Sequence, residues 1–282
     1  MDPDDIVRAA RLVAEAGSLI IAAGAGMGVD SGLPDFRGAQ GFWRAYPALG
    51  ASGLRFEQVA SPATFARDPQ LAWGFYGHRL ALYRATPPHA GHRLLLDWAA
   101  RGRRPLTVFT SNVDGAFQRA GFDPQTLHEC HGTIDWLQCT EPCSDAIWPA
   151  DALQPDIDPT RCRWRGEVPT CPHCGAVARP NILMFGDGRW LPARTDAQDA
   201  RQRDWLARQA RRPLVIELGA GLAVPTVRHF SAMMVRRGAT LLRINLREPE
   251  VRPGDGLGLG AGALEALQAI DRVLRGTAGP SG

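Results

Sequence analysis

Hydrophobic positions along the chain alternate between short continuous runs and stretches with helical periodicity. Four apolar runs, each with the length and composition of a buried parallel strand, lie at residues 18–23, 106–110, 214–218 and 240–245. Amphipathic stretches precede them, at residues 4–17, 90–101, 197–212 and 227–238. Strands that alternate with helices in this way predict a doubly wound, parallel α/β sheet.

Two segments interrupt this alternation. Residues 39–88 are rich in aromatic side chains in mostly helical surroundings, and residues 132–179 are rich in Cys, Pro and Trp with little periodicity. Both are predicted to be insertions that together form a second, smaller domain. Residues 276–282 are expected to form a disordered tail.

Composition narrows the class of protein without identifying it. The 282 residues include 45% apolar and 22% charged side chains, as in ordinary globular proteins. No apolar run approaches the roughly 20 residues that cross a bilayer, and residues 1–10 lack the layout of a secretory signal. A net charge of +3 is too small to indicate nucleic-acid binding. We therefore expect a cytoplasmic protein without membrane or direct nucleic-acid partners; its oligomeric state is left open.

Four of the six cysteines fall in two close pairs, which predicts a metal site. The pairs are Cys139 with Cys143 and Cys171 with Cys174. Four thiolates from two turns suit tetrahedral Zn²⁺, and a site closed by four protein ligands is structural. Cys162 lies between the pairs as an alternative ligand.

The first strand runs into a glycine-rich turn, Gly24-Ala25-Gly26-Met27-Gly28. A strand followed by such a turn can place backbone N–H groups against a pyrophosphate. In a chain with 31 glycines the same cluster also occurs as a plain tight turn. The loop after it carries Asp35, Phe36 and Arg37, which would cover a bound ligand or form a surface connection.

Polar residues follow the next predicted strand and a later segment. Asn112 and Asp114 come after the strand at 106–110, where ligands of open α/β sheets bind, although helix capping would also explain them. Two histidines, His128 and His131, are close enough in sequence for either to be a base in the same cleft. The residues themselves do not decide between the two.

Taken in order, these segments resemble the sirtuin family, the NAD-dependent protein deacylases. The matching motifs are the two cysteine pairs together with GAGMGVDSGLPDFRG (24–38), TSNVDGAFQRAG (110–121), HG (131–132), RPNILMFGD (179–187) and IN (244–245). The resemblance implies a Rossmann-like NAD-binding domain made of residues 1–38, 89–131 and 180–275. The helical insertion 39–88 and a zinc-binding module, 132–179, would form the small domain.

The resemblance also implies the reaction. NAD would be a co-substrate that transfers ADP-ribose to the acyl group of an acylated-lysine protein, releasing nicotinamide and O-acyl-ADP-ribose. His131, rather than His128, would be the catalytic base. Asn112 would position the ribose and water, and Asp114 would hold the nicotinamide carboxamide.

Further roles follow for the remaining motif residues. Gly24, Ala25 and Gly26 would cradle phosphate, and Asn245 would contact the adenosine ribose. Asp35 and Gly219 would also bind the cofactor. Phe36 and Arg37 would shield the reactive intermediate. A strand over residues 182–187 would pair with the substrate peptide through Ile182, Leu183 and Phe185.

The chain departs from the family pattern at several positions. Ser111 replaces the usual Gln, Gly28 replaces Ser, Asp187 replaces Glu, and Gly219-Ala220-Gly221 replaces Gly-Thr-Ser. The last change removes two hydroxyls expected near the cofactor. These departures keep open a second activity on the same scaffold, mono-ADP-ribosyl transfer or NAD hydrolysis.

One motif bears on the acyl group. Tyr76 and Arg79 resemble the Tyr-x-x-Arg of sirtuins that prefer acidic acyl groups such as succinyl. Arginine can grip a carboxylate through two parallel hydrogen bonds. The alternative is a solvated arginine on an amphipathic helix.

Overall fold

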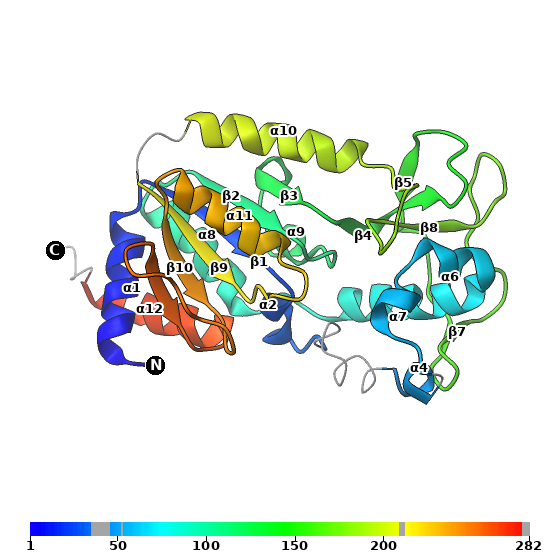
Figure 1. The fold of residues 1–282 in the computed structure, drawn as a ribbon, viewed down its shortest axis with the longest axis horizontal. Helices are drawn as coiled ribbons and strands as arrows, with labels where there is room; N and C mark the ends of the chain where they lie inside the picture. Colours follow the sequence, from blue (N-terminus) through cyan, green and yellow to red (C-terminus); the bar gives the residue numbers. More distant parts are fainter. Residues whose placement is uncertain (35–45, 52, 209–211, 278–282) are drawn as a thin grey trace.

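A six-stranded, fully parallel sheet forms the larger of two units (Figure 1) in the computed structural model, which describes residues 1–34, 46–51, 53–208 and 212–277. Its strand order is β11-β10-β9-β1-β2-β3. The strands are β1 (Ser18–Ala23), β2 (Leu106–Thr110), β3 (Leu127–Glu129), β9 (Pro213–Leu218), β10 (Thr240–Ile244) and β11 (Gly256–Leu259). The central pair, β1 and β2, runs parallel with Leu19 opposite Leu106.

Helices cover both faces of this sheet, so the predicted doubly wound architecture is confirmed. Along β1, Leu19 and Ile21 point into a core shared with one group of helices, whereas Ile20 points into a second core on the opposite face. The first group is α1 (Pro3–Glu15), α8 (Ala90–Arg101) and α12 (Ala263–Thr277); α10 (Ala193–Arg208) and α11 (Thr226–Arg236) cover the other face. The continuous apolar run of β1 is explained by this burial on both sides.

The second unit combines a small antiparallel sheet with helices and has a core rich in aromatic side chains. Strands β5 (Ile147–Pro149), β4 (Gly132–Cys139) and β8 (Ala178–Ile182) form the sheet in that order, and β6 (Ile157–Asp158) pairs with β7 (Arg163–Trp164). The helices are α4 (Pro47–Ala51), α5 (Phe56–Val59), α6 (Pro62–Arg67) and α7 (Pro69–Ala85). Trp73, Phe75 and Tyr76 of α7 are almost completely buried in the core.

Short helices complete the architecture around the strand ends. They are α2 (Gly26–Val29), α9 (Ala116–Arg119) and the 3-10 turn η1 (Pro124–Thr126). No helix of the described residues is long and apolar enough to cross a membrane.

The four strands predicted from apolar runs are present, with ends that agree within one residue, but two strands of the large sheet were missed. β3 has only three residues, and β11 alternates Gly with Leu, so neither makes an apolar run. Helix α12 continues to Thr277, two residues into the predicted tail; residues 278–282 lie outside the described part. β8 pairs with β4, which places residues 180–182 in the smaller sheet and not in the large one.

The strand predicted over residues 182–187 is wrong. β8 ends at Ile182, and the chain then turns at Gly186, whose φ is +67°. The turn is held by Asp187, whose carboxylate pairs with the Arg179 guanidinium (2.6 and 2.9 Å) and accepts the N–H of Met184 (3.3 Å). Both charged side chains are buried, at 1% and 0% exposure, and the N–H groups of Leu183 and Phe185 donate to the carbonyls of His131 and Ala60.

Candidate active site

The carboxyl ends of five parallel strands meet on one side of the large sheet, where open α/β folds bind ligands. β1 leads into Gly24, β2 into Ser111, β3 into Cys130, β9 into Gly219 and β10 into Asn245. β1 lies between β2 and β9, so the chain order reverses at this strand. The predicted glycine turn, the asparagines and the candidate histidine His131 therefore lie at the same edge of the large sheet.

The glycine turn is shaped by close backbone packing against the turn after β9. A Cβ on Gly24 would lie 2.8 Å from Ala220 Cα, and a Cβ on Gly26 would lie 2.7 Å from Gly219 Cα. The amide of Gly24 donates to the Leu218 carbonyl, and that of Gly26 donates to the Gly219 carbonyl, both at 2.9 Å. These two predicted phosphate-binding residues thus join the two turns through their own N–H groups.

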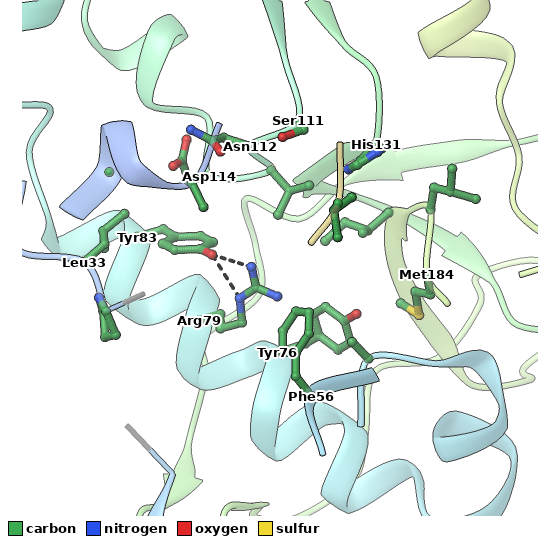
Figure 2. Close-up of a pocket in the computed structure, with 18 of the residues that line it drawn as sticks. Leu33, Phe56, Tyr76, Arg79, Tyr83, Ser111, Asn112, Asp114, His131 and Met184 are labelled. Carbon is green, nitrogen blue, oxygen red and sulfur yellow. Dashed lines mark hydrogen bonds between the residues drawn. The ribbon is translucent and has the colours of Figure 1, made fainter. Parts of the chain in front are cut away.

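Asn112 and Asp114 are held in place by backbone groups. The Asn112 side-chain amide donates to the Gly24 carbonyl at 2.9 Å, which fixes it against the glycine turn. Asp114 accepts the N–H of Ala116 at 2.9 Å and is 6% exposed. Burial raises the pKa of Asp114, and the Ala116 N–H opposes that effect by lowering it. Both side chains line the same cavity (Figure 2).

The structure separates the two candidate histidines. His128 is buried, its Nδ1 lies 2.9 Å from Gln202 Oε1, and burial lowers its pKa. His131 instead lines the cavity, with its Nε2 3.3 Å from Thr226 Oγ1. The glycine that follows it, Gly132, has φ +74°, and a Cβ there would lie 2.1 Å from the Asn181 carbonyl oxygen. Glycine is thus required at residue 132, where β4 begins directly after His131 and packs against β8.

A cavity of about 240 Å³ opens where the strand ends meet the second unit. Three groups of side chains line it. They come from the strand ends (Asn112, Asp114, His131), from α7 (Tyr76, Arg79, Tyr83) and from the segment at the end of β8 (Ile182, Leu183, Phe185). The structure therefore brings the predicted base, the predicted acyl-group residues and the predicted peptide-contacting residues together.

Arg79 lies inside this cavity and is only 8% exposed, which excludes the alternative of a solvated arginine. Its Nε and Nη2 donate to the Tyr83 hydroxyl, as the dashed lines in Figure 2 show. Tyr76 is also buried, and burial raises its pKa well above the ordinary value. Leu183 and Phe185 are 38% and 40% exposed at the cavity mouth.

A second cavity, of about 360 Å³, adjoins the first through Ala25 and Val224, which line both. Gly26, Gly219 and Asn245 contribute to its wall. The Asn245 amide donates to the Ala220 carbonyl at 2.8 Å, and its oxygen accepts two backbone N–H groups. This asparagine therefore braces the turn after β9 as well as facing the cavity.

The four paired cysteines converge in the second unit. Their Sγ atoms all lie within 4.8 Å of one another, with 3.6 Å between Cys139 and Cys174 and 3.7 Å between Cys143 and Cys171. Zinc–sulfur bonds of about 2.3 Å in a tetrahedron place sulfurs about 3.8 Å apart, so the donor set fits Zn²⁺. Cys162 is not in this group; it is buried in the apolar core, where burial raises the pKa of its thiol to about 12.

Some predicted residues cannot be placed, and some wall residues were not predicted. Asp35, Phe36 and Arg37 lie outside the described residues. Tyr83, Phe56 and Met184 line the cavity without having been identified from the sequence. Only Tyr83 carried a usable signal, because it follows Arg79 by four residues and so shares its face of a helix.

This arrangement defines a class of protein first: a doubly wound α/β fold with a dinucleotide-type glycine turn and a ligand cleft shared with a small cysteine-bearing unit. The Sir2 family model matches residues 24–207, which is more than half of the chain. The chain belongs to the Sir2 family, so the expected family is confirmed.

Relatives and solved structures agree with this assignment. An NAD-dependent protein deacylase 1 from Pseudomonas aeruginosa is 33% identical over 236 residues, covering 83% of this chain and 85% of the relative. An NAD-dependent protein deacylase from Pyrococcus abyssi is 29% identical over 96% of this chain and 98% of its own length. The mitochondrial NAD-dependent protein deacylase sirtuin-5 of Canis lupus familiaris is 32% identical over 63% of this chain and 58% of its own.

Two solved structures are similar over nearly the whole chain. A point mutant of a Sir2 homologue in complex with ADP ribose superposes with a TM-score of 0.72 at 26% identity, covering 100% of this chain and 99% of its own. A Sir2 homolog–NAD complex gives a TM-score of 0.70 at 25% identity, with 98% and 95% coverage.

Proposed function

We propose that this chain is an NAD-dependent protein lysine deacylase. The observation that carries the proposal is the shared cavity, in which His131, Asn112 and Asp114 face Arg79 and the segment that ends β8. The names of the relatives, which are protein deacylases from bacteria, archaea and a mammal, support the same activity.

In this proposal the two cavities bind different parts of the substrates. The second cavity, with Gly219 and Asn245, would take the adenosine half of NAD, and the first would take the nicotinamide ribose and the acyl-lysine. His131 would accept a proton from a ribose hydroxyl once the acyl oxygen has displaced nicotinamide. Asn112, fixed by the Gly24 carbonyl, would hold the ribose, and Asp114 would bind the nicotinamide carboxamide.

We also propose that the acyl group is acidic, with succinyl as the test case. A desolvated guanidinium at the cavity wall binds a carboxylate far better than a methyl group. Tyr76, four-fifths of a helical turn before Arg79, would add its hydroxyl to the same acyl end.

A zinc ion held by Cys139, Cys143, Cys171 and Cys174 would be structural in this proposal. All four positions of a tetrahedral ion would be filled by thiolates, which leaves none for substrate. Its contribution would be to join the β4 end to the turn around Gly175, whose N–H donates to the Cys171 carbonyl at 3.0 Å.

The experiment is a reaction with NAD and either an acetyl-lysine or a succinyl-lysine peptide. We expect nicotinamide release matched by free lysine in the peptide; since the chain itself contains no lysine, that signal comes from the substrate alone. His131→Ala should lower turnover at least about 100-fold and keep the thermal midpoint, because a general base contributes 10²–10⁴-fold.

A matched control is His229→Ala, which removes an exposed histidine of α11 and should keep turnover. NAD binding without reaction of either peptide would contradict the deacylase proposal. Transfer of ADP-ribose to protein, or NAD loss without peptide, would point to the alternative activity.

A further inference from the structure

Tyr83 lies one helical turn after Arg79 on α7, and its hydroxyl holds the guanidinium. Arg79 Nε and Nη2 lie 2.9 and 2.5 Å from the Tyr83 oxygen. Tyr83 is 4% exposed and lines the same cavity, so the contact is made away from bulk water. A hydrogen bond from a charged donor in such surroundings is stronger than one between neutral groups.

Three aromatic rings lie close to the Arg79 guanidinium. Arg79 Cζ is 5.3 Å from the centroid of the Phe75 ring, 5.8 Å from that of Tyr76 and 5.3 Å from that of Tyr83. These distances are within the range of favourable cation–π contact. Figure 2 shows Arg79 between Tyr83 on one side and Tyr76 with Phe56 on the other.

A guanidinium can present two forked edges to a carboxylate, one formed by Nε and an Nη atom and one formed by the two Nη atoms. Tyr83 engages the Nε–Nη2 edge. A substrate carboxylate would therefore bind a guanidinium whose Nε–Nη2 edge is already turned towards the Tyr83 hydroxyl. The phenol in this way sets both the direction and the depth at which an acyl carboxylate is bound.

We propose that Tyr83 is a positioning residue that gives this enzyme its preference for acidic acyl groups by holding Arg79 in its binding orientation. The inference rests on the proposed deacylase function and names a residue that acts on the substrate through Arg79. Without this acceptor, more of the ordering of the long arginine side chain must come from the substrate, and that ordering weakens binding. An uncharged acetyl group gains nothing from the guanidinium and is affected less.

The test is Tyr83→Phe, which keeps the ring and removes the hydroxyl. At saturating NAD, the succinyl-to-acetyl ratio of kcat/KM should fall about tenfold, with the change in the KM for the succinyl peptide. Tyr83→Met removes the same oxygen and serves if the Phe variant does not fold. Tyr46→Phe is the matched control, because it removes a buried hydroxyl from the same aromatic cluster, one that bonds His78 Nδ1 at 2.9 Å; the ratio should stay within twofold.

A double variant separates positioning from a general structural effect. Arg79→Met should lower the ratio, and adding Tyr83→Phe to it should lower the ratio by less than a further twofold. An equal loss from Tyr83→Phe with and without Arg79, or an unchanged ratio in the single variant, overturns the proposal.

Binding is measured separately, by fluorescence anisotropy of labelled succinyl-lysine and acetyl-lysine peptides. Suppose the wild type binds the succinyl peptide more tightly than Tyr83→Phe does, but turns over neither peptide. That result supports the positioning role and refutes the deacylase function. If the wild type deacylates the acetyl peptide but neither binds nor turns over the succinyl peptide, the deacylase function is supported and the positioning role of Tyr83 is refuted. Failure of both peptides in both measurements refutes the two together.

Discussion

The histidines of this chain lie in different surroundings: some are buried in the core, and one lines the cavity. His89 and His92 are buried beside each other near the start of α8, where the His89 ring lies 3.0 Å from the Met27 carbonyl and the His92 ring 3.2 Å from the His89 carbonyl. Their rings serve the packing of the large unit. His131 instead lines the cavity, and that location makes it the residue proposed as base.

The burial of His92 makes the stability of the fold sensitive to acid. Burial first, and then the neighbouring His89, lower the pKa of His92 to about 4 from about 6.5. The unfolded chain therefore binds this proton more readily, so stability is lost as pH falls from about 6.5 towards 4. We expect His92 to account for about 2 kcal/mol of the loss between pH 7 and pH 5.

Urea unfolding of the wild type and of His92→Gln at both pH values measures this contribution. The variant should lose less stability between pH 7 and pH 5 than the wild type does. Equal losses in the two proteins would show that His92 is protonated as easily in the folded state as in the unfolded one.

At the scale of elements, helix α7 is positioned by a glycine. Gly74 lies in the interior of α7, and a Cβ there would be 2.0 Å from the Cys162 carbonyl oxygen just before β7. The helix can approach β7 this closely only without a side chain at that position. Because α7 also carries Tyr76, Arg79 and Tyr83, the close contact sets the depth of the cavity wall.

Gly74→Ala should destabilise the fold although alanine favours helices. The gain in helix propensity is about 1 kcal/mol. Backbone must move to relieve the 2.0 Å approach, and overpacking of this kind costs about 1–3 kcal/mol or more. Because the atom approached is backbone, we take the upper end of that cost and expect a net loss of up to about 2 kcal/mol in the free energy of unfolding, together with lower succinyl-peptide affinity.

Chemical denaturation measures the loss, and Gly188→Ala is the control. Gly188 is exposed, and a Cβ added there meets no atom within 4 Å. Its substitution should change the free energy of unfolding by less than about 0.5 kcal/mol. A stabilised Gly74→Ala variant would mean that α7 and β7 separate at little cost.

On the scale of the whole molecule, the sequence predicted the elements that continuous patterns encode and missed those that depend on particular side-chain and backbone contacts. The apolar runs of β1, β2, β9 and β10 are visible because each is buried on both faces. β11, with alternating Gly and Leu, and the turn after β8 are fixed by tertiary contacts, the latter by the Arg179–Asp187 pair. Such pairings have no local periodicity.

The same difference holds for the candidate site. Strand-end polar residues such as Asn112 and Asp114 could be found because their place in the chain predicts their place in the cleft. The choice of His131 over His128 needed family resemblance, since both are close to the same strand. Tyr83 was missed although it follows Arg79 by four residues, because the spacing does not show that the Arg79 side chain turns towards it.

The cysteine cluster predicts that the second unit depends on metal. Metal analysis should find about one zinc per chain, and a strong chelator should release it. Loss of the ion should lower the thermal midpoint by about 5 °C or more, since 1 kcal/mol corresponds to roughly 2–4 °C in proteins of somewhat smaller size. The paired change Cys171→Ser with Cys174→Ser should behave like the chelated protein. A metal content well below one zinc per chain in folded, active protein would refute the assignment.

Helices α1 and α12 pack against each other at the end of the molecule opposite the second unit (Figure 1). Arg11 is exposed on α1, and the chain contains no lysine. Arg11→Lys would therefore introduce the single side-chain amine of the molecule at that remote end. Amine coupling above neutral pH, with the α-amino group blocked, would anchor the enzyme to a sensor surface in one orientation, with the cleft turned to the solution.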